Sequence, residues 1–495
     1  MLSDDQAARE RAINPSMSFC VSAPAGSGKT ELLTQRLLAL LARVDRPEQV
    51  LAITFTRKAA SEMAARIMEK LEQASADAPI EAAHERVTRD LAQQVLAHAQ
   101  ERSWRLDESS LNLRTIDSFC HELTRQMPIL SGMGGIAEPV DNAVPLYERA
   151  VSDFLHQASV GKVGESISAL LGHFDNRWNK VSDLLVALLS RRGDWGPHIG
   201  QHHDPTSAEH AIESTVADLV NDRLDALSEL FTHDTQELCE VINGAREVLA
   251  LSPITLTHDA EALEGWRAVS GAFLTNDLTW RKARGINAKQ GFQKDADLKE
   301  RFLALLARYG DSEPLREALI EVRYLPNPLA RGQGWQLVVL LSSLLPVLQA
   351  HLLLAFQRTG TVDHTHIALA ASQALGGDEQ PTALAERLDY QLEHILVDEF
   401  QDTSSSQAEF LRRLTRGWAE HNATGAMPRT LFIVGDGMQS IYGFRYADAR
   451  LFLQIRQNGL AGLTLEALTL SQNFRSRPAV VSWVNRVFSD LMGKV

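Results

Sequence analysis

The chain has 495 residues, of which 44% are hydrophobic and 23% are charged, and its formal net charge at pH 7 is −14. This composition is typical of a globular protein, and the length predicts more than one domain. The acidic balance argues against a protein whose whole surface binds a polyanion, although a local basic channel can still bind nucleic acid.

The remaining composition argues against secretion and against a membrane span. The 3 cysteines lie far apart, in neither a disulfide framework nor a zinc-binding spacing, and the charged N-terminus lacks the pattern of a secretion signal. The most apolar run, 337–356, is interrupted by Pro346, so we expect a kinked buried helix there. We therefore expect a cytoplasmic protein without a membrane partner.

Short apolar runs rich in β-branched residues recur along the chain, and each ends in polar residues. Near-continuous apolar strands followed by helical patterns are typical of a parallel sheet with both faces covered. The runs are "MSFCVSA" (17–23), "VLAITFT" (50–56), "HILVDEF" (394–400) and "TLFIVGD" (430–436), with "LRTIDSF" (113–119) as a candidate fifth. Leucine-rich helical patterns dominate between 121 and 390, which predicts a large helical insertion that splits one α/β domain.

The segment "APAGSGKT" (23–30) lies between the first apolar run and a leucine-rich helical pattern. Its glycines let the backbone curl so that N–H groups point at a polyphosphate, and the helix that follows adds its positive dipole end. Lys29 can reach the β- and γ-phosphates, and the Thr30 hydroxyl can ligate Mg²⁺. Ala23 replaces the usual first glycine, and the alternative interpretation is a chance glycine-rich turn. The candidate ATP-binding residues here are Ala23, Ala25, Gly26, Ser27, Gly28, Lys29 and Thr30.

Two adjacent carboxylates follow the apolar run in "ILVDEFQDT" (395–403). Nucleotide hydrolysis needs a metal-holding carboxylate and a group that orients water. We expect Asp398 to hold Mg²⁺, directly or through water, and Glu399 to act as general base, because neighbouring side chains at a strand end project to different sides. The alternative is a solvated acidic turn.

Together, several motifs resemble those of the UvrD/Rep-type superfamily 1 helicases, in the order of that family. The "TIDSFC" form and the large insertion look more like the AddA/RecB-type helicase–nuclease subunits. The motifs are "APAGSGKT", "ITFTRKAASEM" (53–63), "TIDSFC" (115–120), "VDEFQDTSSSQ" (397–407), "VGDGMQSIYGFRYAD" (434–448) and "LSQNFRSRP" (470–478).

The resemblance implies an α/β fold: a RecA-like P-loop domain with a parallel sheet, split by an all-helical insertion, followed by the start of a second RecA-like domain. The expected boundaries are 1–120 and 391–462 for the first domain, 121–390 for the insertion and 463–495 for the second domain.

The resemblance also assigns roles to residues near the nucleotide. Gln6 is similar to the glutamine that reads adenine, and Phe474 to the aromatic residue that stacks on it. Gln439 resembles the γ-phosphate sensor that links hydrolysis to DNA binding, and Arg475 the arginine that reaches the γ-phosphate. Each has a plainer alternative: Gln6 as an exposed helix residue, Gln439 as a turn cap, and Phe474 as core. The expected catalytic residues are Glu399, Gln439 and Arg475.

Single-stranded DNA is bound by polar groups along its backbone and by aromatic faces. Two residues depart from the family pattern: Asp117 stands where relatives often have histidine, and Tyr446 replaces a glycine. The run 280–294 is rich in Lys and Arg and contains Gly285 and Gly291, which predicts a flexible loop that either grips DNA or is merely solvated. The expected DNA-binding residues, for which core packing is the alternative, are Thr54, Phe55, Thr56, Arg57, Thr115, Ser118, Tyr442, Phe444 and Arg445.

By resemblance, the chain is the N-terminal motor portion of an ATP- and Mg²⁺-dependent helicase that moves 3′ to 5′ on single-stranded DNA. The expected partners are single-stranded DNA, duplex DNA ends and a second subunit of a recombination-repair helicase–nuclease. Such a motor hydrolyses ATP between two RecA-like domains, so we expect this chain alone to be weak or inactive. The alternatives are a P-loop kinase or transferase, and a nucleotide-binding scaffold subunit without motor activity.

Overall fold

In the computed structural model, the contacts divide the chain into two compact units. The sheet unit comprises Met1–Val151, Leu184–Pro197 and Leu352–Val495, and the helical unit comprises Ser152–Asp183 and His198–His351. The residues that the structure describes are 4–76, 83–128, 137–156, 161–199, 205–231, 234–292, 296–328, 332–377, 381–440, 443 and 447–492.

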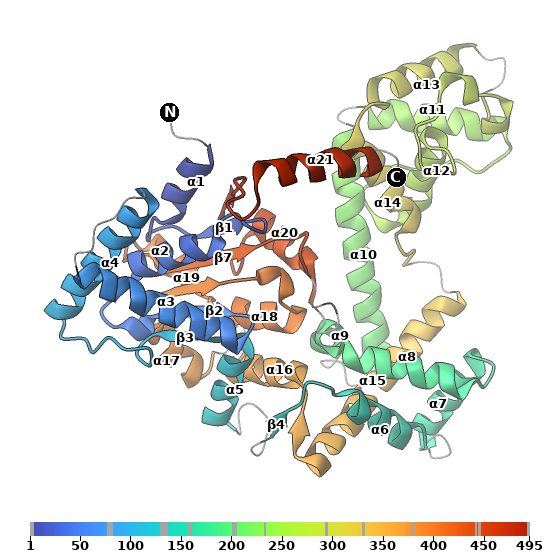
Figure 1. Ribbon diagram of the computed structural model, residues 1–495. Helices are drawn as coiled ribbons and strands as arrows, with labels where there is room; N and C mark the ends of the chain where they lie inside the picture. Colours follow the sequence, from blue (N-terminus) through green and yellow to red (C-terminus); the bar gives the residue numbers. More distant parts are fainter. Residues whose placement is uncertain are drawn as a thin grey trace. The chain divides into compact units, whose positions relative to one another are not determined.

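A 6-stranded parallel sheet of order β3-β2-β6-β7-β1-β8 forms the centre of the sheet unit (Figure 1). This arrangement confirms the predicted parallel α/β sheet. A separate 2-stranded pair joins β4 (Glu138–Pro139) to β5 (Thr361–Val362). The strands of the large sheet are β1 (Phe19–Ser22), β2 (Val50–Thr54), β3 (Asn112–Thr115), β6 (His394–Val397), β7 (Thr430–Gly435) and β8 (Glu466–Thr469).

Helices accompany the sheet, as the helical patterns predict. Alternate strand residues such as Val21, Ala52 and Val434 pack with α2, α3 and α4 in one apolar cluster. The helices of the sheet unit include α1 (Asp4–Ala12), α2 (Lys29–Leu41), α3 (Arg57–Ser75), α4 (Ala83–Glu101), α5 (Ile116–Gln126), α16 (His364–Leu375), α17 (Ala383–Gln391), α18 (Ser405–Leu414), α19 (Trp418–Ala423), α20 (Ala449–Asn458) and α21 (Pro478–Met492), with short 3₁₀ turns at η1 (Pro47–Gln49) and η5 (Phe400–Asp402).

The two compact units divide the chain at other residues than the expected domain boundaries, which stay a prediction. Strand β8 pairs with β1 in the large sheet, with Val21 opposite Leu468, although the expected boundary places 463–495 in the second domain. The sheet unit also takes in 121–151 and 352–390, which the sequence places in the insertion. The candidate strand 113–119 ends at Thr115, because the Thr115 side chain accepts a hydrogen bond from Ser118 N and caps α5.

Arg36 is a fully buried arginine on α2 that fixes the N-terminal segment to the sheet. Its guanidinium donates to the carbonyls of Ala12, Asn14 and Met17, and lies 5.5 Å from the ring centre of Phe19. Burial lowers the pKa of Arg36 to about 9. Helix α1 is therefore held in one place next to the strands.

Arg36 also donates to the Thr430 hydroxyl (3.1 Å), which in turn lies 2.8 Å from His394 Nδ1. Burial, with the charges of Arg36 and Arg43, lowers the pKa of His394 to about 3. The folded chain therefore keeps this histidine neutral.

We expect the free energy of unfolding to fall as the pH drops below about 6.5, the pKa of an exposed histidine, because the unfolded chain then binds a proton that folded His394 does not. The expected loss between pH 7 and pH 5 is about 2 kcal/mol from this residue. Urea unfolding at the two pH values measures it. His394→Asn should reduce the pH dependence by that amount, whereas the exposed His156→Asn should leave it unchanged. An unaltered pH dependence in His394→Asn would refute the prediction.

A buried ionic cluster joins distant segments of the sheet unit. Arg192 donates to both carboxylate oxygens of Asp363, one at 2.7 Å, and the Tyr147 hydroxyl donates to the same carboxylate. Burial would raise the pKa of Asp363, but the charge and hydrogen bonds of Arg192 bring it below its ordinary value. Asp363 also caps α16 by accepting from His366 N (2.7 Å). The cluster ties α6 (Val144–Leu155), α9 (Arg192–Ile199) and α16 together.

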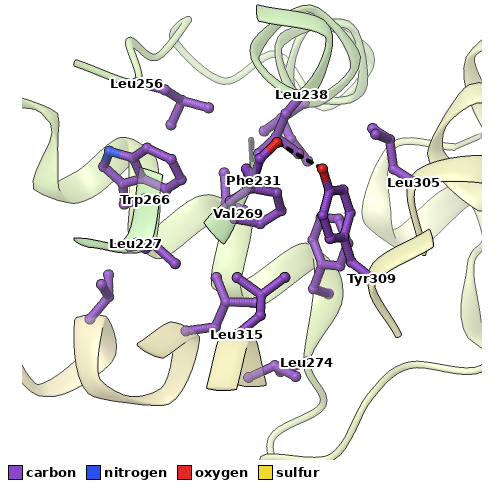
Figure 2. Close-up of a cluster of buried hydrophobic side chains, with 14 of the residues drawn as sticks. Leu227, Phe231, Leu238, Leu256, Trp266, Val269, Leu274, Leu305, Tyr309 and Leu315 are labelled. Atoms are coloured by element: carbon purple, nitrogen blue, oxygen red, sulfur yellow. Dashed lines mark hydrogen bonds between the residues drawn. The ribbon is translucent and has the colours of Figure 1, made fainter. Parts of the chain in front are cut away.

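The helical unit has its own apolar core (Figure 2). Phe231 lies at its centre, with ring centres 5.9 Å from Trp266 and 5.0 Å from Tyr309, and the Tyr309 hydroxyl donates to Phe231 O at 2.7 Å. Such a core is what an independently packed insertion requires. The helices here are α7 (Gly161–His173), α10 (Pro205–Leu230), α11 (Thr235–Val248), α12 (Leu263–Phe273), α13 (Ala296–Tyr309) and α14 (Glu313–Tyr324), while α8 (Trp178–Ser190) and α15 (Gln333–Thr359) contribute residues to both units.

Helix α15 runs through Pro346 without a break. Among the described residues, Gly334–Thr359 is the one helical stretch long and apolar enough to cross a membrane, and 33% of its most apolar window is buried. Leu348 and Leu352 are buried, whereas Val338 and Leu354 are exposed. The helix is thus less buried than the sequence predicts, and length and composition are weak evidence for a membrane span.

Candidate active site

The segment "APAGSGKT" forms the turn between β1 and α2. Gly26 and Gly28 adopt left-handed backbone angles, with φ of +80° and +76°, which glycine adopts without strain. Ala23 is fully buried, and its N–H donates to Gly435 O (2.9 Å), so this residue extends the pairing of β1 with β7. An alanine fits there because residue 23, directly after β1, does not adopt the left-handed φ of Gly26 and Gly28. The structure therefore accounts for the departure from the usual first glycine.

Gly26 also touches the segment that contains Asn473, Phe474 and Arg475. Phe474 N donates to Gly26 O at 2.7 Å. A Cβ added to Gly26 would lie 2.7 Å from Asn473 Oδ1 and 2.8 Å from Arg475 Cβ. The loop and this segment therefore fit together only when residue 26 has no side chain.

We expect Gly26→Ala to weaken nucleotide binding by at least about tenfold, because the strained φ and the clash with Asn473 together misplace the loop, at a cost of order 1–3 kcal/mol. Fluorescence titration with a mant-labelled ATP measures this. Gly425→Ala is the matched control, because Gly425 has a φ of +78° but no atom within 4 Å of the added Cβ. Equal effects of both substitutions on nucleotide affinity would contradict the prediction.

Lys29 and Glu399 form an ion pair across the site, with Nζ 2.8 Å from Oε2. Glu399 Oε2 also accepts from Gln401 Nε2 (2.7 Å), and the Gln401 side-chain oxygen accepts from Asp436 N (2.9 Å). Glu399 has a left-handed φ of +53°, an uncommon angle for a residue with a side chain. Gln401 thus positions Glu399 against β7, a role that sequence reasoning missed although the residue lies within the quoted "DEFQD".

Asp398 lies beside Glu399 but in a different environment. Its N–H donates to Ile53 O (2.9 Å), which continues the pairing of β6 with β2. Burial raises the pKa of Asp398 to about 6, the Glu399 charge adds to this, and Lys29 opposes it. The Glu399 side chain is 39% exposed, so the two carboxylates have different surroundings, as expected for neighbours at a strand end.

One cavity of about 440 Å³ brings together Thr30, Asp398, Glu399 and Gln439. A hydroxyl and carboxylates are the hard oxygen donors that Mg²⁺ prefers. Ser27 Oγ is buried and has no hydrogen-bond partner among the described residues, which leaves it available to a phosphate oxygen. The residues present therefore fit Mg²⁺ and a polyphosphate.

Gln439 does cap its own turn, since its Nε2 donates to Asp436 Oδ2 (2.6 Å) and its N–H to Asp436 O (3.0 Å). Its place in the wall of the 440 Å³ cavity also leaves it next to the carboxylates. The structure thus shows the turn cap, and the role of Gln439 as γ-phosphate sensor stays a prediction.

Phe474 is not core, because 66% of it is exposed. Arg475 is exposed too, and its N–H is held by Asn473 Oδ1 (2.9 Å). Gln6 is exposed on α1, and its amide donates to Glu10 Oε1 (3.0 Å). Phe474 and Arg475 therefore lie at the phosphate loop, and one hydrogen bond of Gln6 lies within its own helix.

A second cavity, of about 890 Å³, gathers most of the predicted DNA-binding residues of the two strand ends. It is lined by Phe55, Thr56, Arg57, Thr115 and Ser118. Thr56 and Thr115 also cap α3 and α5. Thr54 is buried in β2 and does not line this cavity. Tyr442, Phe444, Arg445 and the divergent Tyr446 lie outside the described residues.

Asp117 faces this second cavity, but it is not an isolated carboxylate. It accepts from Gln407 Nε2 (2.8 Å) and lies 3.2 Å from His364 Nδ1, while His364 Nε2 lies 3.4 Å from Asp141. His364 and Asp141 are far from Asp117 in the sequence, so no local pattern could have indicated them. When protonated, His364 offsets the negative charge expected to repel a phosphate.

The basic run in the helical unit is anchored rather than flexible. Ile286 and Phe292 are buried, and Phe292 stacks on Phe302 at 4.6 Å. Gly291 is held against α11, because an added Cβ would lie 2.0 Å from Ala245 O. The expectation of a mobile loop is therefore wrong for 280–292, and Lys294 lies outside the described residues. Within this run, three cations are exposed and have no ion-pair partner among the described residues: Lys282, Arg284 and Lys289.

Comparison with known proteins agrees with this arrangement. The family model described as "UvrD/REP helicase N-terminal domain" matches residues 4–459. The chain is 26% identical to an "ATP-dependent helicase/nuclease" subunit of Exiguobacterium sibiricum over 95% of its length, and 27% identical to the protein of the same description from Desulfitobacterium hafniense over 98%. The chain spans 38% and 36% of the length of these two relatives, respectively.

The family match covers far more than half of the chain and contains the phosphate loop, the strand-end carboxylates and all strands of the large sheet except β8. The resemblance seen in the motifs is thereby confirmed. The chain belongs to the UvrD/REP helicase N-terminal domain family.

Proposed function

We propose that this chain is the ATP-hydrolysing motor portion of a helicase that translocates on single-stranded DNA. The observation that carries the proposal is a shared wall: Phe55 and Thr56 line both the 440 Å³ cavity with the carboxylates and the 890 Å³ cavity with the predicted DNA-binding residues. A movement of this strand end on nucleotide binding changes both cavities together, which is the physical requirement for coupling hydrolysis to DNA binding.

Residues of the first cavity and of the adjoining phosphate loop divide the chemistry among them. Lys29 breaks its ion pair with Glu399 and binds the phosphates. Glu399 then takes the proton of the attacking water. Arg475 neutralises charge that develops on the transferred phosphoryl group. Thr30 and Asp398 would hold Mg²⁺, which supplies Lewis-acid stabilisation of the phosphate oxygens when bound.

The remaining features of the proposal follow the family and the named relatives. The motor moves 3′ to 5′, opens duplex ends, and belongs to a helicase–nuclease that acts with a second subunit in recombination and repair in the bacterial cytoplasm. The relatives' description as subunits of an "ATP-dependent helicase/nuclease" supports the association with a nuclease and with another subunit. Exposed Lys282, Arg284 and Lys289 offer the helical unit a contact with duplex phosphates.

A scaffold that binds nucleotide without turnover is the competing function. The observed Lys29–Glu399 pair argues against it, because a scaffold has no use for a positioned general base. The kinase or transferase alternative does not fit the family match.

The test is steady-state ATP hydrolysis with and without oligo-dT, in this chain and in one that also carries a complete second RecA-like domain. We expect background turnover in the first and DNA-stimulated turnover in the second. Nucleotide binding without turnover in both would favour the scaffold. Phe55→Ala should weaken the stimulation by oligo-dT more than it weakens turnover without DNA.

A further inference from the structure

The wall of the 890 Å³ cavity contains carboxylates, which is unexpected where a DNA backbone is proposed to bind. Asp117 and Asp141 both line this cavity. Arg57 and Arg125 line it too, and both are exposed and have no ion-pair partner among the described residues. The two arginines balance the two aspartates. These four side chains therefore give the wall no net positive charge with which to attract a polyanion.

Three other titratable groups line the same cavity. Glu122 is paired with Arg114, which neutralises it. The Nε2 atom of His121 is buried and has no hydrogen-bond partner among the described residues, so no carboxylate there stabilises a proton. The third group is His364. It is therefore the group whose protonation decides the charge of the wall.

His364, the first residue of α16, lies between the two aspartates. Its Nδ1 is 3.2 Å from Asp117 Oδ2, and its Nε2 is 3.4 Å from Asp141 Oδ1. Asp117 belongs to the first turn of α5, and Asp141 to the segment before α6. The His364 side chain is 31% exposed and lines the cavity, so a phosphate can reach its ring.

The surroundings of His364 on its other side are also acidic or neutral. A neighbouring cavity of about 230 Å³, which His364 lines as well, contains Asp363, Asp402 and the uncharged Gln407. Asp363 is neutralised by Arg192 (2.7 Å). The described residues thus place a carboxylate rather than a free cation next to His364, which favours a positive charge on the imidazole.

The aspartate that faces His364 is held in place by the helices around it. Gln407 donates from the first turn of α18 to Asp117 Oδ1 (2.8 Å). Asp363, which precedes His364, caps α16 by accepting from His366 N (2.7 Å). The imidazole and its aspartate therefore come from helix ends that are fixed by hydrogen bonds.

The chemistry of histidine links this arrangement to protons. An imidazolium has two N–H groups and a positive charge, whereas the neutral ring has one N–H group and no charge. An exposed histidine changes between these forms near pH 6.5. A phosphate next to the ring adds a negative charge that stabilises the imidazolium. Binding of the phosphate and uptake of the proton then favour each other.

We propose that His364 is a phosphate-binding residue of the 890 Å³ cavity, and that single-stranded DNA binds there together with a proton. This inference rests on the proposed function, since it concerns the DNA on which the motor moves. The affinity for oligo-dT falls as the pH rises from 6 to 8.5, because the imidazole loses its charge. His364 accounts for about fivefold of this change, the size of one partly exposed ion contact.

Fluorescence anisotropy with labelled oligo-dT, at both pH values and several salt concentrations, tests the proposal. His364→Asn should weaken binding about fivefold at pH 6 and leave it unchanged at pH 8.5. At pH 6 it should also reduce the slope of log affinity against log salt by about 0.7, the value of one single-strand phosphate contact. His156→Asn, at an exposed histidine that does not line the cavity, is the matched control and should change neither quantity.

Two further measurements separate a phosphate contact from a structural role. Titration calorimetry in two buffers of different ionisation enthalpy measures the proton directly, and the uptake seen in the wild type at pH 7 should be smaller in His364→Asn. Asp117→Asn should tighten oligo-dT binding at pH 8.5, because it removes a repelling charge. Thermal unfolding at both pH values checks that each variant is folded.

The proposal is overturned if folded His364→Asn keeps the pH dependence and the salt slope of the wild type, or if it weakens binding equally at both pH values. Phe55→Ala distinguishes this failure from failure of the proposed function, because Phe55 lines the same cavity but carries no charge. If only Phe55→Ala weakens binding, the cavity binds DNA without the proposed contact. If the wild type does not bind oligo-dT at either pH, the proposed function fails as well.

Discussion

Glu399→Gln is expected to lower ATP turnover by about 10²–10⁴-fold, the contribution of a general base, while nucleotide binding is retained. The amide cannot take a proton from water. It also removes the ion pair with Lys29 (2.8 Å), which a γ-phosphate must otherwise displace. We therefore expect mant-ATP to bind at least as tightly as to the wild type. Turnover is measured with oligo-dT in a chain that carries a complete second RecA-like domain.

The exposed Glu420→Gln on α19 is the matched control for the loss of one carboxylate, and it should leave turnover unchanged. Gln401→Ala offers an intermediate test, because it removes the hydrogen bond that orients Glu399 but keeps the carboxylate. Its turnover should fall between that of the wild type and that of Glu399→Gln. Wild-type turnover in Glu399→Gln would exclude this residue as the base.

Lys29→Ala is expected to weaken mant-ATP binding by at least about 30-fold, because removing one member of a desolvated charge pair costs roughly 2 kcal/mol or more. The Lys29 side chain is only 14% exposed, so its attraction for phosphate is weakly screened. Equilibrium titration at fixed ionic strength measures the change.

Lys162→Ala, at an exposed lysine of α7, controls for the loss of one positive charge and should leave the affinity unchanged. The unfolding midpoint of Lys29→Ala shows whether Glu399, left without its partner, disturbs the fold. Unchanged mant-ATP affinity in a folded Lys29→Ala variant would contradict a phosphate role for this lysine.

Local patterns predicted the strands and the phosphate loop well, because each depends on residues close together in the chain. Apolar runs that must be covered on both faces are short and continuous, and the four principal ones became β1, β2, β6 and β7. Strand β8 was not predicted, because an edge strand with exposed residues, such as Ala467 and Thr469, has no such run. Its position is decided by main-chain pairing with β1.

Part of the chemistry of the site could also be predicted from the sequence. Lys29, Asp398 and Glu399 were assigned from their motifs, and the parallel sheet brings Lys29 and Glu399 together although 370 residues separate them. The spacing of Asp5 and Arg9, one helical turn apart, was the available signal for their ion pair, which lies against Phe474. The resemblance pointed to Gln6, whose contact with adenine stays a prediction, because a motif identifies a residue type without showing what its side chain contacts.

The amino-acid sequence was sufficient for the family, the parallel sheet and the identity of the phosphate-binding and acidic motifs, since these are properties of contiguous segments. Only the tertiary structure decided which side chains complete them. Gln401 orients Glu399, His364 lies against Asp117, and Arg9 lies against Phe474 because strand ends and helix faces from distant segments meet at one edge of the sheet. Those contacts depend on burial and on side-chain direction, which spacing along a chain does not specify.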